Sequence, residues 1–167
     1  MQIRPLSSAD AAAFKALRLR GLLECPSAFA SSFEEEQGDT LNAIAQRLAQ
    51  QPESTVFGAF DDSQLVGLLG LVRENQRKLA HKGFVWGVYV AGEARGKGVA
   101  GELLGQALVY AKLTLDLRQV NLGVNLNNLA AIALYRRHGF KTFGTERGFM
   151  LLEGQPHDEL HMVCVLA

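Results

Sequence analysis

The sequence lacks the broad positive charge that marks many nucleic-acid-binding proteins. Its 17 basic and 17 acidic side chains cancel, so the formal net charge of the 167 residues is zero. A general nucleic-acid binder needs a basic excess to displace counterions from the phosphate backbone. We therefore expect no nucleic-acid partner, and any positively charged site must be local.

Cysteines and long apolar runs are also scarce. Cys25 and Cys164 are the only cysteines, and they lack the paired spacing of a zinc site or a disulfide framework. No run approaches the ~18 apolar residues of a membrane helix. The opening MQIRPLSSAD lacks the apolar stretch of a signal peptide. The sequence therefore predicts a cytoplasmic protein with two reduced thiols, no metal and no membrane segment.

The sequence does contain enough apolar residues to form the core of a single domain over residues 1–167. The chain is 48% hydrophobic, and a single domain usually takes ~100 to 200 residues. The apolar spacings and turn residues predict the order βααβββαβαββ, which is an α/β fold. The expected strands are residues 2–6, 55–60, 65–72, 84–90 and 119–124, with two more between 141 and 167. The expected helices are one that ends near residue 24, then residues 41–50, 98–115 and 128–138, with a loop over 27–39.

The most informative segment is VYVAGEARGKGVAGELL, a strand followed by a glycine-rich turn that opens a helix. The first amides of a helix lack internal partners and lie at the positive end of its dipole, so they can hold a phosphate or diphosphate. Gly96 and Gly98 have no Cβ to keep a ligand away from the main chain, and Arg95 and Lys97 add positive charge. Between residues 73 and 118, eight basic residues stand against four acidic ones, which also suits a polyphosphate ligand.

Several alternatives exist for this turn. A P-loop would need the pattern GxxxxGK[ST], which is absent. Gly96, Gly98 and Gly101 match the dinucleotide pattern GxGxxG. However, the preceding strand ends several residues too early, near Val90, and the next strand closes with Asn125 instead of an acidic residue. A tight turn without a ligand is the remaining alternative.

Two patterns carry a family resemblance. RGKGVA (residues 95–100) resembles the [RQ]xxGx[GA] signature of the GNAT superfamily of acyl-CoA-dependent N-acyltransferases. NLAAIALYRRHGF (residues 128–140) resembles the second block of that superfamily, NxxAIxLYxxxGF, and follows at about the expected distance. The likeness covers about residues 84–143. PSAFASSFEEE (residues 26–36) is reminiscent of bacterial members, in the region that usually faces the acceptor.

The resemblance implies a mixed sheet flanked by helices, in which a splayed central strand pair forms the acyl-CoA cleft. It implies acetyl-CoA as co-substrate, with its diphosphate on the glycine-rich turn and its pantetheine arm beside the strand over residues 84–90. The residues implied to bind it are Val88, Tyr89, Val90, Arg95, Gly96, Lys97, Gly98, Val99, Ala100, Asn128 and Ala131. Whether the Tyr89 side chain binds ligand or is structural stays open, because it points to the face opposite Val88 and Val90.

Tyr135 is the predicted catalytic residue. Asn128, Ala131 and Tyr135 are three and four positions apart, so they share one helix face. Taken alone, such a tyrosine is most often a core residue with a satisfied hydroxyl. The resemblance implies instead that Tyr135 protonates the departing thiolate after an amine attacks the thioester. The acceptor is expected to be a small-molecule or protein amine.

The sequence does not identify a general base. Many relatives carry a glutamate on the strand that corresponds to residues 84–90, whereas this strand has no acid. Its absence leaves open an alternative function, a CoA-binding regulatory or sensor module with weak or no catalysis. The conceivable substitutes, each of which is also typical of a solvated surface, are Glu34, Glu35, Glu36, Glu74, His81 and His157.

The C-terminal strand raises the question of oligomeric state. Residues 161–166 are largely apolar, and an apolar strand at the edge of a sheet can pair with a second copy. Dimers are also common among the relatives. A homodimer is therefore an expectation if this strand lies at an edge.

Overall fold

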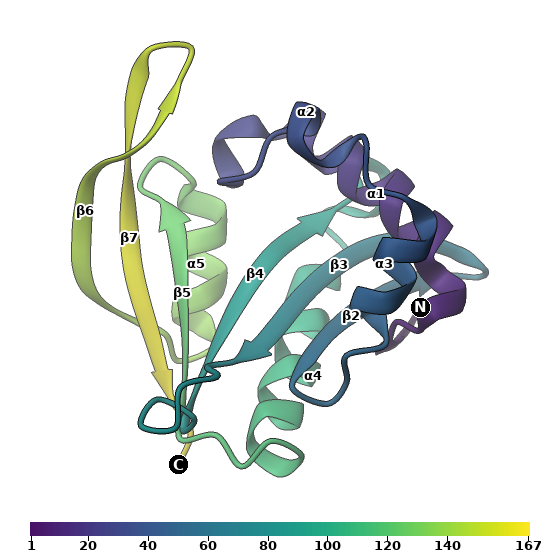
Figure 1. Cartoon of the computed structure of the whole chain (residues 1–167). Coiled ribbons are helices and arrows are strands. Elements are labelled where there is room, and N and C mark those ends of the chain that lie inside the picture. The colour runs from purple at the N-terminus through teal and green to yellow at the C-terminus, as the bar shows by residue number, and fades with distance from the viewer.

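The computed structural model describes residues 1–167 as a seven-stranded mixed sheet with helices on both faces (Figure 1). The strands follow the order β1-β2-β3-β4-β5-β7-β6 across the sheet. Their bounds are β1 Gln2–Pro5, β2 Ser54–Asp61, β3 Gln64–Arg73, β4 Lys82–Val90, β5 Gln119–Asn125, β6 Lys141–Leu152 and β7 Gln155–Val165. The helices are α1 Ala11–Glu24, α2 Phe33–Glu36, α3 Leu41–Leu48, α4 Val99–Leu113 and α5 Leu129–Arg137.

The strands and long helices expected from the sequence are confirmed, whereas the loop over residues 27–39 is partly wrong. It contains the short helix α2, which begins at a capping box. The Ser32 hydroxyl accepts from the Glu35 amide at 3.3 Å, and the Glu35 carboxylate accepts from the Ser32 amide at 2.7 Å. A helix of one turn is too short to show an apolar period, so only the Ser-x-x-Glu spacing could have predicted it.

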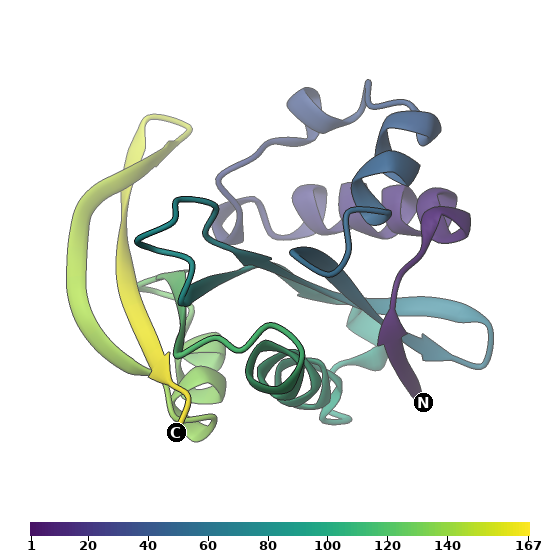
Figure 2. The same cartoon turned by 60° about the horizontal axis from the view of Figure 1, so that its bottom comes forward.

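The core lies on both faces of the central strands. Figure 2 shows α1, α2 and α3 on one side of the sheet, and α4 and α5 on the other. On β3, the consecutive residues Leu68 and Leu69 are both almost fully buried, because successive side chains of a strand point to opposite faces. Leu103 and Leu104 of α4 have no measurable exposure. The sheet is therefore a rigid support for whatever its central strands present.

The central pair β4 and β5 is splayed, as the resemblance implied. The two strands pair in parallel only from Lys82 to Phe84, and they diverge beyond that point (Figure 1). On its other edge, β4 stays paired with β3 but carries a bulge, since Trp86 faces Gly70 and Tyr89 faces Leu68. Gly87 takes a positive φ of 64° in this bulge, which glycine allows at little cost. The edge of β4 toward β5 is thus left without a strand partner.

The condition on which the homodimer expectation depended, an edge position for the C-terminal strand, is not met. β7 lies between β5 and β6 and is paired on both sides. Its main-chain groups are therefore satisfied within the chain, and it offers no edge to a second copy. The edges of the sheet are β1 and β6. None of the helices is both long enough and apolar enough to cross a lipid bilayer.

Candidate functional site

A cleft of about 950 Å³ opens where β4 and β5 diverge. It is bounded by the outer half of β4, the turn before α4, the end of β5 and α5. Of the residues predicted from the sequence to bind or act on acetyl-CoA, only Lys97 does not line it. The predicted residues that line it are Val88, Tyr89, Val90, Arg95, Gly96, Gly98, Val99, Ala100, Asn128, Ala131 and Tyr135.

The glycine-rich turn presents free main-chain amides to this cleft. Gly96 and Gly98 have positive φ angles of 74° and 82°, a region that other residues rarely adopt. The amides of residues 96–101 donate to no acceptor in the chain, and the first helical bond runs from the Glu102 amide to the Gly98 carbonyl at 3.1 Å. A Cβ added at either glycine would meet no atom within 4 Å. The turn therefore combines free donors with open space, which is what an anion requires.

The Arg95 side chain is engaged away from these amides. Its Nε donates to the Val90 carbonyl at 2.8 Å, and its Nη2 lies 3.6 Å from Glu24 Oε2. Its guanidinium also lies 5.6 Å from the centre of the Tyr89 ring. Arg95 thus fastens the turn to the end of β4. The attraction for an anion in this region comes from the amides and the helix dipole more than from Arg95.

The Tyr89 side chain makes a structural contact between strand and helix. Its hydroxyl donates to Glu24 Oε2 at 2.5 Å, and its ring covers Gly21, where an added Cβ would lie 3.0 Å from the ring. Burial and the hydrogen bond to Glu24 raise the pKa of Tyr89 to about 12. This side chain therefore joins β4 to α1, and Tyr89 contributes to the cleft wall as part of the strand.

Tyr135 is held by α5 with its hydroxyl unpaired. Asn128 caps the helix, because its Oδ1 accepts from the Ala131 amide at 3.2 Å. The Tyr135 ring is buried and packs edge-to-face on Phe140, with centroids 5.8 Å apart. Its hydroxyl makes no hydrogen bond within the chain, and burial raises its pKa to about 12. The phenol therefore remains protonated at neutral pH and is able to donate a proton or a hydrogen bond into the cleft.

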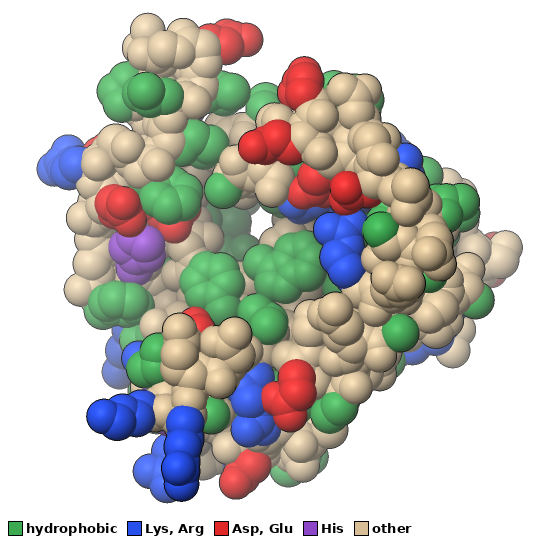
Figure 3. Space-filling model, viewed as in Figure 1, with side chains coloured by type: hydrophobic (Ala, Val, Ile, Leu, Met, Phe, Trp, Pro, Cys, Tyr) green, Lys and Arg blue, Asp and Glu red, His purple; other side chains and the backbone are tan.

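A smaller pocket of about 230 Å³ adjoins the cleft at the point where β4 and β5 diverge, which we call the fork. Both are lined by Val85, Trp86 and Gly87 of β4 and by Gly123 of β5. The space-filling view shows an opening through the molecule between the α1–α2 side and the β5–β7 side (Figure 3). A ligand in the cleft and a second ligand in the pocket could therefore meet at the fork.

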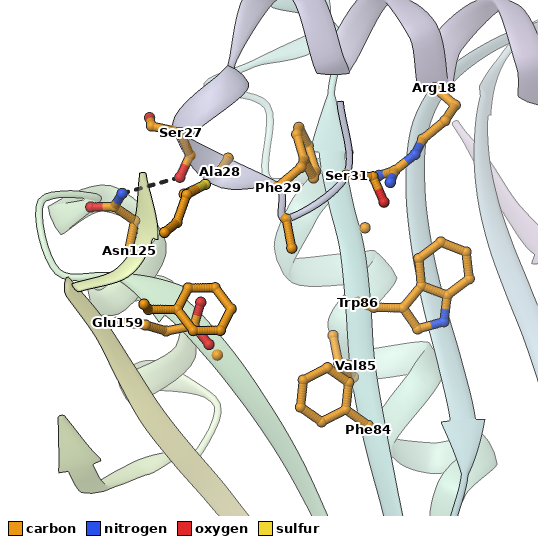
Figure 4. Close-up of a pocket in the computed structure, with 15 residues that line it drawn as sticks. Arg18, Ser27, Ala28, Phe29, Ser31, Phe84, Val85, Trp86, Asn125 and Glu159 are labelled. Atoms are coloured by element: carbon orange, nitrogen blue, oxygen red, sulfur yellow. Dashed lines mark hydrogen bonds between the residues drawn. The ribbon is translucent and has the colours of Figure 1, made fainter. Parts of the chain in front are cut away.

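The pocket has aromatic walls and charged groups at opposite sides. Phe29, Phe84 and Trp86 form much of its apolar lining (Figure 4). Arg18 and Glu159 face it from opposite sides. Phe29 belongs to the segment after α1 for which the family resemblance implied a role toward the acceptor.

Arg18 is anchored but keeps one free nitrogen. Its Nε and Nη2 donate to the two Glu36 carboxylate oxygens at 2.9 and 2.8 Å, and its guanidinium lies 4.9 Å from the Phe29 ring centre. Nη1 is buried and has no hydrogen-bond partner. Burial opposes ionisation of Glu36, but the bonds from Arg18 hold its pKa below the usual value. Glu36 is thus an ion-pair partner.

The other substitutes for a base are poorly placed. Glu34, Glu35, Glu74 and His81 line neither the cleft nor the pocket. His157 lines the cleft, but its Nδ1 lies 3.1 Å from Asn125 Nδ2.

The sequence analysis assigned no site role to the residues that line the pocket, and Asn125 and Glu159 illustrate why. Asn125 Nδ2 donates to the Ser27 carbonyl at 3.1 Å and so joins the end of β5 to the segment after α1. A polar residue closing a buried strand was the available signal for it. No sequence pattern around Glu159 indicates a site residue, because only the pairing of β7 with β5 brings Glu159 to the fork.

Comparisons with known proteins agree with this geometry. The acetyltransferase (GNAT) family model matches residues 21–140. L-amino acid N-acetyltransferase AaaT of Escherichia coli (strain K12) is 27% identical over 120 residues, which make up 72% of this chain and 74% of that protein.

Three solved structures share the fold. An acetyltransferase of the GNAT family from Streptococcus pneumoniae superposes with a TM-score of 0.86 at 22% identity, covering 99% of each chain. Ribosomal-protein-alanine N-acetyltransferase from Brucella melitensis gives 0.82 at 24% identity, covering 99% of this chain and 100% of that chain. The Salmonella typhimurium protein yncA, solved with its cofactor acetyl-CoA, gives 0.82 at 19% identity, covering 100% of this chain and 94% of that chain.

Proposed function

Because the chain belongs to the acetyltransferase (GNAT) family, we propose that it moves the acetyl group of acetyl-CoA to a primary amine, which attacks the thioester directly. The diphosphate rests on the free amides of residues 96–101. The pantetheine arm follows the unpaired edge of β4, which can bind a peptide-like chain as a strand would. This places the thioester at the fork, near Tyr135.

The observation that carries this proposal is the meeting of cleft and pocket at Val85–Gly87 and Gly123. An amine in the pocket and a thioester in the cleft are then held in contact, and such proximity supplies much of the acceleration in acyl transfer. A main-chain amide of β4 polarises the thioester carbonyl. Tyr135 gives a proton to the departing thiolate, which its high pKa suits because the phenol is protonated at neutral pH.

For the acceptor, we propose an amine that carries an apolar side chain and a nearby carboxylate or carbonyl oxygen. The aromatic walls suit the side chain, and the unpaired Arg18 Nη1 suits the oxygen. An L-amino acid, free or at the N-terminus of a protein, has this chemistry. The activity named for the E. coli relative points in the same direction.

The test is release of free CoA thiol from acetyl-CoA in the presence of an amine panel. The panel contains L-phenylalanine, L-methionine, L-phenylalaninamide, a peptide with N-terminal alanine, a peptide with internal lysine, and spermidine. We expect the largest acceleration with the apolar L-amino acids or the N-terminal peptide. A preference for spermidine or for internal lysine would contradict the proposed acceptor class while supporting acetyl transfer.

A second candidate function is favoured by one observation, the absence of an acid on β4. It is a CoA-binding regulatory or sensor module with weak or no catalysis. The same panel separates the two functions. If acetyl-CoA binds but no amine accelerates thiol release, the sensor module is supported and the enzymatic function of this site fails.

A further inference from the structure

Glu159 of β7 places its carboxyl group over Gly123 of the neighbouring strand β5. A Cβ added at Gly123 would lie 1.9 Å from Glu159 Oε1 and 2.5 Å from Cδ. The carboxyl therefore fills the volume that a β5 side chain would otherwise occupy. Glycine at position 123 is what allows a carboxylate from β7 to reach this point.

This carboxyl belongs to the pocket and not to the cleft, whereas Gly123 lines both. The carboxyl thus lies on the acceptor side of the point where amine and thioester meet. Figure 4 shows it facing the pocket across from Arg18 and Trp86. No side chain of β4 supplies an acid here.

The electrostatic surroundings leave this carboxylate free to take a proton. Its side chain is 15% exposed and accepts no hydrogen bond from the chain. The charged groups that face it are His161 on its own strand, with Nδ1 at 3.9 Å, Glu146, its cross-strand partner on β6, and Arg18 across the pocket. Arg18 is already paired with Glu36. Burial raises the pKa of Glu159, His161 lowers it and Glu146 raises it, with a net increase.

We propose that Glu159 is the general base that accepts a proton from the ammonium group of the acceptor. The inference rests on the proposed function, because it assumes that the amine enters through the pocket. One proton passes from R–NH3⁺ to the carboxylate and later to solvent. The neutral amine then forms the C–N bond as the C–S bond breaks. The second N–H proton leaves to solvent, and Tyr135, which gives its proton to the CoA thiolate, takes up one proton from solvent.

The test is Glu159→Gln, which keeps the size of the side chain and removes the base. With L-phenylalanine as acceptor, we expect kcat/KM at pH 7 to fall about 100-fold, the lower end of the range for general base catalysis. With hydroxylamine, which is largely unprotonated at this pH, the loss should be under about 10-fold. Activity of the variant should also recover as the pH rises toward the pKa of the amine, because solvent then removes the proton.

Two further variants control for structure. Glu34→Gln makes the same change on the exposed helix α2 and should leave kcat/KM for both acceptors unchanged. The double variant Glu159→Ala with Gly123→Asp supplies a carboxylate from β5, and it should be at least about 10-fold faster than Glu159→Ala alone. Melting temperature and acetyl-CoA affinity confirm that each variant is folded.

The outcomes distinguish this proposal from the proposed function. If the wild type releases no thiol with any amine of the panel, the proposed function fails. If the wild type is active but Glu159→Gln matches it, or loses the same factor with both acceptors at every pH, the role of Glu159 is overturned and acetyl transfer stands. A folded double variant that stays as slow as Glu159→Ala also contradicts the role.

Discussion

The hydroxyl of Tyr135 can be removed with little effect on the fold. The Tyr135→Phe change keeps the ring that packs on Phe140. The hydroxyl has no partner in the chain, so its removal leaves no donor or acceptor unpaired, and the free energy of unfolding should change by less than ~0.5 kcal/mol. Any large change in activity must then come from the chemistry of the hydroxyl itself.

The expected loss of activity is large. General acid catalysis contributes ~100-fold to 10,000-fold, so kcat should fall at least about 100-fold, which corresponds to about 2.7 kcal/mol in the activation free energy. The diphosphate site lies at the start of α4, so the dissociation constant of acetyl-CoA should change by less than about threefold. Because burial raises the pKa of Tyr135 to about 12, the ratio of wild-type to variant kcat should be constant between pH ~6 and ~9.

The assay combines thiol release at saturating acetyl-CoA with calorimetric titration of acetyl-CoA. Tyr110→Phe is the matched control. The Tyr110 hydroxyl accepts a hydrogen bond from Thr55 Oγ1 at 3.3 Å, and Tyr110 does not line the cleft. Tyr110→Phe should leave kcat unchanged. Equal kcat for wild type and Tyr135→Phe would refute the role in protonating the thiolate. A loss of kcat matched by an equal loss of acetyl-CoA affinity would show that the hydroxyl binds the cofactor instead.

Three further predictions concern the turn, the pocket wall and acid stability. Gly98→Ala should weaken acetyl-CoA binding about 10-fold, because the added Cβ enters the open space beside the free amides. It should also lower the free energy of unfolding by about 1 to 2 kcal/mol, because φ at this position is 82°. Unchanged affinity in calorimetry would count against the diphosphate site. In Gly70→Ala, the new Cβ would lie 2.1 Å from the Trp86 ring and would displace it. The KM for the acceptor should therefore rise while acetyl-CoA affinity stays constant. A loss of acetyl-CoA affinity with an unchanged KM for the acceptor would place Trp86 outside the acceptor pocket. The hydrogen bond from Arg4 holds the pKa of Asp10 far below its usual value, so this carboxylate stabilises the fold above pH ~4 and the stabilisation is lost as the pH falls. Asp10→Asn should therefore lower the free energy of unfolding at pH 7 by about 1 to 3 kcal/mol. Chemical denaturation should show that the difference between wild type and variant shrinks below pH ~4. A difference that does not depend on pH would contradict this explanation.

Much of the fold and of the cofactor cleft follows from local patterns. The apolar stripe of α4 and the run FVWGVYV of β4 predicted elements that the structure confirms within a few residues. The turn at Gly96 and Gly98 could be predicted because positive φ angles and free amides leave a recognisable spacing. In these segments, residues close in sequence determine the geometry.

The features that the sequence did not predict depend on contacts between distant residues. Arg95 is held by Val90 and Glu24, so its charge could not be assigned to a ligand or to the fold from its position alone. Glu159 reaches the fork only because β7 inserts between β5 and β6, and no pattern around residue 159 encodes that order. The acceptor side is assembled from separate strands and a loop, whereas the cofactor turn is a single continuous segment.

The central claim is that free main-chain amides at the start of α4 hold the diphosphate of acetyl-CoA. A crystal structure of the complex tests it most directly. We expect diphosphate oxygens within ~3.2 Å of several amides of residues 96–101, with the thioester at the fork of β4 and β5. Acetyl-CoA bound with its diphosphate elsewhere, and these amides facing only solvent, would contradict the claim.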